Sequence, residues 1–180
     1  AGTSRTGDRL VAACEISRRE LGDSLCCMTS LDHKIPPPVI ALLCAGLAWV
    51  LARSTPTFMF ALPARIPIAV VLALAGVSLA LWGMASFRKV DTTVNPLSPD
   101  QASSVVRSGP FQFTRNPMYL GMALVLLGFC AYLANPLSVM AIVVFAAYIT
   151  RFQIIPEERL LLEKFGEPFG QYMRSVRRWI

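Results

Sequence analysis

Charged residues are scarce in this chain. Only 16% of its 180 residues are Asp, Glu, Lys or Arg, whereas 54% are hydrophobic, and the mean hydropathy is +0.54. Soluble domains are usually about a quarter charged. The shortage excludes an ordinary soluble enzyme and predicts a membrane protein that spends most of its length crossing the bilayer.

Metal ligands are scarce as well. The chain has one histidine, His33, and its five cysteines show no paired metal-ligand spacing: they are Cys14, Cys26, Cys27, Cys44 and Cys130. We therefore expect no metal site and no disulfide framework.

The net charge of +6 is explained by membrane topology rather than by nucleic-acid binding, because the basic residues are spread over several loops. Five Lys and Arg residues precede the first apolar run, two lie in the next loop, four lie in residues 88–115 and six follow residue 150. The positive-inside rule then predicts that both termini and residues 88–115 are cytoplasmic.

Apolar runs predict an all-α, multi-pass membrane protein with about four transmembrane helices. A bilayer core requires about 20 apolar residues, and the 22 uncharged residues 66–87 match this length best. Ala73, Gly76 and Ala80 recur at helical spacing there and allow close contact with another helix. The predicted spans within a domain of residues 35–180 are 35–52, 66–87, 118–133 and 137–155.

A polar motif opens the third span, with the sequence Arg115-Asn116-Pro117-Met118-Tyr119-Leu120-Gly121. Asn116 is a favoured N-cap residue, and Pro117 suits the first helical position because its missing N–H would be unpaired there. Residues 118–150 carry no charge and are interrupted only by Asn135-Pro136. This pattern predicts a membrane hairpin.

A second polar cluster follows the hairpin. The tight Asn135-Pro136 turn makes the two helices antiparallel neighbours, so we expect Arg151, Glu157 and Glu158 to return to the membrane face of Arg115. Helix capping and interfacial anchoring explain each cluster separately. A functional interpretation explains both together: one carboxylate receives a cofactor's amino group or ribose hydroxyls, while Arg115 or Arg151 pairs with an anionic group.

Three flanking segments carry less information. Residues 1–34 are polar, begin with alanine rather than methionine and fit either a surface helix or residues added to the native chain. Thr92, Thr93 and Asn95 lie in a long loop and are candidate substrate contacts, although turn chemistry explains them equally well. After Glu158 we expect an amphipathic helix, broken near Gly166 and ending in a basic, aromatic anchor at the interface.

The paired motifs resemble those of the isoprenylcysteine carboxyl methyltransferase family of integral membrane methyltransferases. The resemblance covers residues 88–180 and rests on residues 115–121, the charge-free hairpin, Glu157-Glu158, Phe165-Gly166 and Tyr172. It implies S-adenosylmethionine as cofactor, bound on the cytosolic side. By position, the cofactor contacts implied are Arg115, Asn116, Pro117, Tyr119, Leu120, Gly121, Glu157 and Glu158.

Asn116 stands where the family often has histidine; its amide can hydrogen-bond the cofactor but cannot titrate near neutral pH. We hypothesise that Arg151 is the catalytic residue and orients an anionic acceptor. The acceptor classes left open are a prenylcysteine carboxylate, a phospholipid amine and a thiol. A sterol-type reductase using NADPH and a non-enzymatic four-helix scaffold remain alternatives.

Overall fold

The computed structural model describes residues 35–56, 63–88 and 107–180, and this part of the chain contains helices and no strand. The predicted all-α fold is therefore confirmed. The N-terminal segment 1–34 and the loop with Thr92, Thr93 and Asn95 lie outside the described residues.

Within the described residues, three helical runs are long and apolar enough to cross a membrane: Pro37–Ser54, Arg65–Ser86 and Pro136–Phe165. A shorter apolar helix, α4 (Pro117–Leu133), packs among them. The first two runs correspond to α2 (Pro37–Ser54) and α3 (Arg65–Arg88). The helical run that holds the predicted span 137–155 continues past residue 155 to Phe165.

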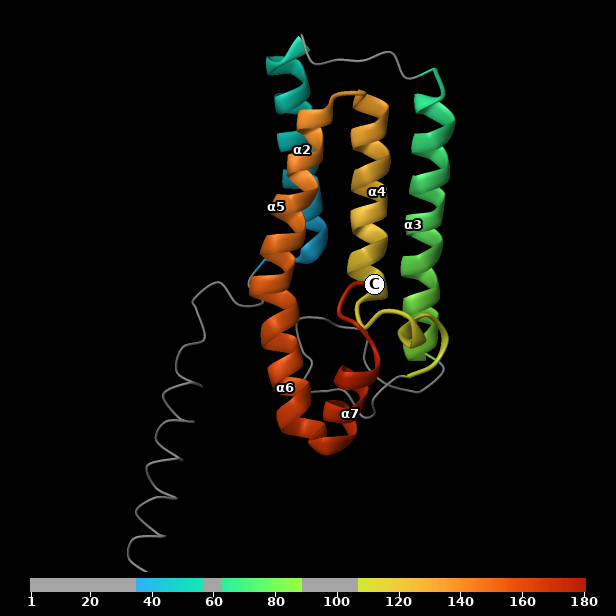
Figure 1. The fold of residues 1–180 in the computed structure, drawn as a ribbon, viewed down its shortest axis with the longest axis vertical. Coiled ribbons are helices and arrows are strands. Elements are labelled where there is room, and N and C mark those ends of the chain that lie inside the picture. Colours follow the sequence, from blue (N-terminus) through green and yellow to red (C-terminus); the bar gives the residue numbers. More distant parts are fainter. Residues whose placement is uncertain (1–34, 57–62, 89–106) are drawn as a thin grey trace, which may run out of the picture. The chain divides into compact units, whose positions relative to one another are not determined.

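That last run, which carries the labels α5 and α6 in Figure 1, consists of four consecutive elements. It begins with the 3₁₀ turn η4 (Pro136–Val139) and continues as α5 (Met140–Ile149). A π-helical turn, η5 (Thr150–Ile154), then leads into α6 (Ile155–Phe165). The remaining described elements are the 3₁₀ turn η3 (Gly109–Gln112) before α4 and the helix α7 (Glu167–Ser175).

Small residues bring α3 and α4 into close contact. A Cβ added to Gly121 would lie 2.5 Å from the Gly76 carbonyl oxygen and 3.1 Å from the Ala80 Cβ. A Cβ added to Gly76 would in turn collide with the Gly121 carbonyl oxygen. The predicted close packing at Gly76 and Ala80 is confirmed, because backbones this near leave no room for side chains.

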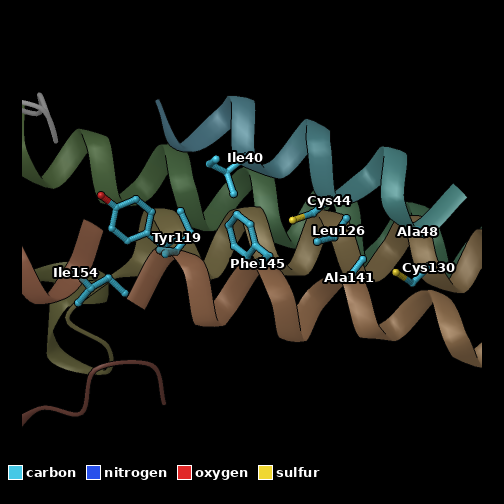
Figure 2. Packing of buried hydrophobic residues seen from close by; sticks show 10 residues of the cluster. Ile40, Cys44, Ala48, Tyr119, Leu126, Cys130, Ala141, Phe145 and Ile154 are labelled. Carbon is cyan, nitrogen blue, oxygen red and sulfur yellow. The ribbon is translucent and has the colours of Figure 1, made fainter. Parts of the chain in front are cut away.

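The core lies between α2, α4 and α5. Figure 2 shows Ile40 and Cys44 of α2 facing Leu126 of α4 and Phe145 of α5. Phe145 is completely buried, whereas Leu42 on the other side of α2 is 72% exposed. Such an apolar outward surface suits a lipid environment, and it leaves the inner face to hold the helices together.

The turn between α4 and α5 is held by Asn135, which is buried. The Asn135 side chain accepts a hydrogen bond from the Leu137 amide and donates to the carbonyl and hydroxyl oxygens of Thr55, at 3.0 and 3.1 Å. Ala134 before it adopts a left-handed conformation with φ of 50°. The predicted tight hairpin is confirmed, and its turn is also tied to the end of α2.

The π-helical turn determines which side chains face inward after α5. Residues seven apart share a face in a regular α-helix, but a π turn inserts about one extra residue and rotates the rest of the helix relative to α5. Arg151 is exposed, whereas Glu158 is only 8% exposed. The turn therefore separates the face of Arg151 from that of Glu158.

The chain reverses direction after α6. Gly166 has φ of 58° and ends α6, which confirms the predicted break. After α7, the C-terminal segment (residues 176–180) runs back to the start of α4, where the C label lies in Figure 1. This segment, for which we predicted an anchor at the membrane interface, also makes contacts with the rest of the protein.

Candidate ligand site at the open end of the hairpin

The start of α4 is bonded to the C-terminal segment. The Arg115 amide donates to the Arg177 carbonyl at 3.0 Å, and the Asn116 side-chain amide donates to the Arg178 carbonyl at 2.9 Å. The Thr114 hydroxyl also donates to the Arg178 carbonyl, at 3.3 Å. Helix α4 begins at Pro117 as predicted, but the Asn116 side chain makes no capping bond and holds the C-terminal segment instead.

A buried carboxylate joins the two predicted motifs. Glu158 pairs with the Arg115 guanidinium at 3.1 Å and accepts two hydrogen bonds from Arg178, at 3.2 and 2.6 Å. The side chains of Arg115 and Glu158 are 11% and 10% exposed. One carboxylate thus faces two guanidiniums, and the predicted approach of Arg115 to Glu158 is observed.

Glu157 lies beside Tyr119 and has fewer partners. The Tyr119 hydroxyl donates to the Glu157 carboxylate at 3.4 Å, which is long for such a bond. Tyr119 lies with Ile154 at one end of the buried cluster in Figure 2. Glu157 therefore keeps most of its capacity to accept hydrogen bonds.

Arg115 has donors to spare. Its Nε and Nη1 atoms are buried and make no hydrogen bond within the described part of the chain, although Nη1 lies at ion-pair distance from Glu158. The two observations agree if the carboxylate lies off the direction of the N–H bond. Buried donors without partners are unfavourable, so these atoms point to an oxygen-bearing ligand.

Aromatic side chains of α7 support this region from one side. The Tyr172 hydroxyl donates to the Phe111 carbonyl at 2.8 Å, and the Arg107 guanidinium lies over the Tyr172 ring. Burial raises the pKa of Tyr172 to about 12, although the nearby Arg115 and Arg107 charges oppose this change. Tyr172 is therefore a neutral donor at physiological pH.

The remaining predicted cofactor residues lie along α4. Pro117 is buried at the first helical position, near Gly83 of α3, and Leu120 is half-buried. Gly121 faces Gly76 within the α3–α4 contact. These three residues shape the site's surroundings, whereas the polar contacts come from Arg115, Asn116 and the two glutamates.

Arg151 lies apart from this cluster. Its guanidinium lies over the Phe152 ring at 5.5 Å and makes no ion pair with any described residue. It is one of the residues that line an open apolar groove of about 540 Å³ along α5. The groove is lined by Val139, Ile142, Val143, Ala146, Ala147, Thr150, Arg151 and Ile155.

Sequence reasoning did not find Arg178 as a partner of Glu158, nor the contact of Trp179 with the π turn. The Trp179 indole donates to the Thr150 hydroxyl at 3.2 Å. The only signal available was the basic, aromatic composition near the C-terminus, which fits an interface anchor equally well. Among the described residues there is no group of three or more His, Cys, Asp or Glu that could hold a metal ion.

Comparison with known proteins shows which family this chain matches. Residues 64–168 match the model of the family described as phospholipid methyltransferase. A protein of Haemophilus influenzae, described only as uncharacterized, is 40% identical over 63 residues, which are 35% of this chain and all of that protein. No solved structure matches. The matched residues include both polar motifs and end before the C-terminal segment.

Proposed function

This chain belongs to the phospholipid methyltransferase family, part of the isoprenylcysteine carboxyl methyltransferase-like membrane enzymes. We propose that it transfers a methyl group from S-adenosylmethionine to a lipophilic acceptor at the cytosolic membrane face. The acceptor is a prenylcysteine carboxylate, a phospholipid amine or a thiol. Candidate membrane spans and family membership make it a membrane methyltransferase; the cofactor, the acceptor and the orientation are the proposal.

The convergence of the two polar motifs carries this proposal. The hairpin brings Arg115 and Tyr119 of one motif to Glu158 and Glu157 of the other. S-adenosylmethionine presents a carboxylate, an amino group and ribose hydroxyls. The unpaired donors of Arg115 suit the carboxylate, and the lightly bonded Glu157 suits the amino group or the hydroxyls. The residues present therefore fit this cofactor.

The two glutamates have separate roles in this proposal. Glu158 is held between Arg115 and Arg178 and fixes the frame of the pocket. Glu157 accepts from the cofactor. The bound cofactor supplies an electrophilic methyl group, and the protein contributes alignment, because bringing two reactants together in the right geometry removes most of the entropic barrier.

Arg151 is proposed to orient an anionic acceptor group, with the acceptor's apolar chain along the groove of α5. Because Arg151 and Glu158 lie on different faces, this role requires the reacting end of the acceptor to extend from the groove to the cofactor contacts. An exposed cation beside an apolar surface suits a lipid whose charged end lies at the bilayer edge. We expect Arg151→Ala to bind cofactor normally and to lose turnover. Full turnover in this variant would remove Arg151 from the mechanism.

Ligand-dependent stability tests the cofactor. The detergent-solubilised protein is heated with S-adenosylhomocysteine or with NADPH, and a ligand that binds the folded state raises the melting temperature, increasingly as its concentration exceeds its Kd. We expect stabilisation by S-adenosylhomocysteine alone. Stabilisation by NADPH alone favours a reductase, and stabilisation by neither favours a scaffold.

A further inference from the structure

The C-terminal segment (residues 176–180) lies against both motifs. Its main chain accepts hydrogen bonds from Arg115 and Asn116 before α4, and its Arg178 and Trp179 side chains bond Glu158 of α6 and Thr150 of η5. Contacts to the beginning and the end of the hairpin therefore pass through one short stretch. The stretch itself is not helical.

Arg178 makes the strongest of these contacts. Both bonds to Glu158 are charge-assisted and form a fork, a geometry that a guanidinium supplies and an ammonium does not. Hydrogen bonding to Glu158 raises the pKa of Arg178 above its usual value. Because Glu158 is shared, the position of Arg178 also fixes where Arg115 can lie.

The shared carboxylate has a consequence for Arg115. Glu158 has oxygens engaged by Arg178, and the Nε and Nη1 donors of Arg115 stay without hydrogen bonds. If Arg178 were absent, Glu158 would be free to turn toward Arg115 and satisfy those donors itself. Arg178 thus keeps Arg115 available to an external oxygen-bearing group.

We infer that Arg178 is a positioning residue of the ligand pocket. Its bonds to Glu158 hold the C-terminal segment over the site and fix the Glu158 carboxylate, so that Arg115 stays available to bind an oxyanion. The inference rests on the proposed function for the identity of that ligand. It assigns a role to residues outside the stretch matched by the family. The closed segment is the binding-competent form of the site.

Arg177 provides a matched control. It is exposed, carries the same charge and contributes only its main-chain carbonyl to the start of α4. Arg178→Gln and Arg177→Gln therefore remove the same charge from adjacent positions, but only the first breaks the contact with Glu158. Arg178→Lys keeps the charge without the fork.

Two readouts test the inference. In a background with Trp49 and Trp82 changed to Phe, fluorescence reports the surroundings of Trp179. Binding of S-adenosylhomocysteine is measured by calorimetry. We expect Arg178→Gln to shift Trp179 emission to longer wavelength and to weaken binding about tenfold, the effect of about 1.4 kcal/mol. We expect Arg177→Gln to change neither and Arg178→Lys to restore part of both.

Equal Trp179 emission and equal binding in Arg178→Gln and Arg177→Gln would overturn the inference. Tighter binding of S-adenosylhomocysteine by Arg178→Gln would also overturn it, because the segment would then obstruct the site. If Arg178→Gln does not fold, Arg178→Lys against Arg177→Lys repeats the comparison with charge retained. If the wild type does not bind S-adenosylhomocysteine, the proposed cofactor fails. The Trp179 emission then still decides whether Arg178 holds the segment.

Discussion

Glu157 and Glu158 are adjacent in sequence but differ in their surroundings. Glu158 is nearly buried and bonded by two guanidiniums, whereas Glu157 has a single long contact with the Tyr119 hydroxyl. A carboxylate held by charged donors contributes to stability, and one with spare acceptor capacity is suited to a ligand. The same substitution at the two positions should therefore have different effects.

We expect Glu158→Gln to lower the free energy of unfolding by about 2 kcal/mol, because it weakens hydrogen bonds between charged groups. Glu157→Gln should change stability little and weaken binding of S-adenosylhomocysteine. Denaturation in detergent and ligand calorimetry on both variants measure the difference. A stable Glu158→Gln variant, or a Glu157→Gln variant with normal binding, would contradict this division.

Asn116 offers a test at a single hydrogen bond. Its side-chain amide donates to the Arg178 carbonyl, so a residue without a donor cannot replace it. We expect Asn116→Asp to destabilise the protein by about 1 kcal/mol or more, at least as much as Asn116→Ala. Were Asn116 a helix cap, Asp would be as good, since Asn and Asp cap equally well. Thermal unfolding of the two variants separates these outcomes.

Among the elements, α3 and α4 depend on glycine for their contact. A methyl group at Gly76 would collide with the Gly121 carbonyl, and two backbones cannot yield as a side chain can. We expect Gly76→Ala to cost about 1–3 kcal/mol, the usual range for overpacking. Gly46 of α2 is the control, because a Cβ there meets nothing within 4 Å. Equal melting temperatures for Gly76→Ala and Gly46→Ala would contradict the packing.

Local chemistry made several element boundaries predictable. Pro117 lacks the N–H that a first helical position leaves unpaired, Asn135-Pro136 favours a turn, and Gly166 tolerates a positive φ. These features depend on residues close together in sequence. The start of α4, the hairpin and the break after α6 could therefore be predicted.

The site's detailed contacts could not be predicted in the same way. The π turn at residues 150–154 adds one residue to a helix and has no residue signature, yet it decides that Glu158 faces inward and Arg151 outward. The bond from Asn116 to the Arg178 carbonyl joins positions 62 apart. Composition near Arg178 fits a membrane anchor as well as an internal ion pair, so tertiary packing alone decides between them.

For the whole molecule, the starts of α2 and α4 and the ends of α3 and α5 lie at one end of the helices (Figure 1). Gln153 donates to the Ile35 carbonyl at 2.9 Å, and Gly109 lies beside Ser86. The distribution of Lys and Arg places this end in the cytoplasm in our proposal. The ligand site would then open to the cytosol.

Accessibility of introduced cysteines tests this orientation. In a cysteine-free background, Gln171→Cys and Ala64→Cys place a thiol at exposed positions of α7 and of the opposite end. With an impermeant maleimide on right-side-out vesicles, we expect Ala64→Cys to react at once and Gln171→Cys only after permeabilisation. The reverse pattern would put the site on the other side of the membrane.

Transfer of a labelled methyl group is the decisive test of the proposed reaction. Membranes containing the protein are incubated with S-adenosylmethionine labelled in its methyl group, and the label in the lipid extract is compared with that from membranes containing Glu157→Gln. We expect label in a lipophilic product, in an amount that depends on Glu157. The test is repeated over a panel of prenylcysteine, phospholipid amine and thiol acceptors. If membranes containing the wild type label the lipid extract no more than membranes without the protein, the proposed methyl transfer is refuted.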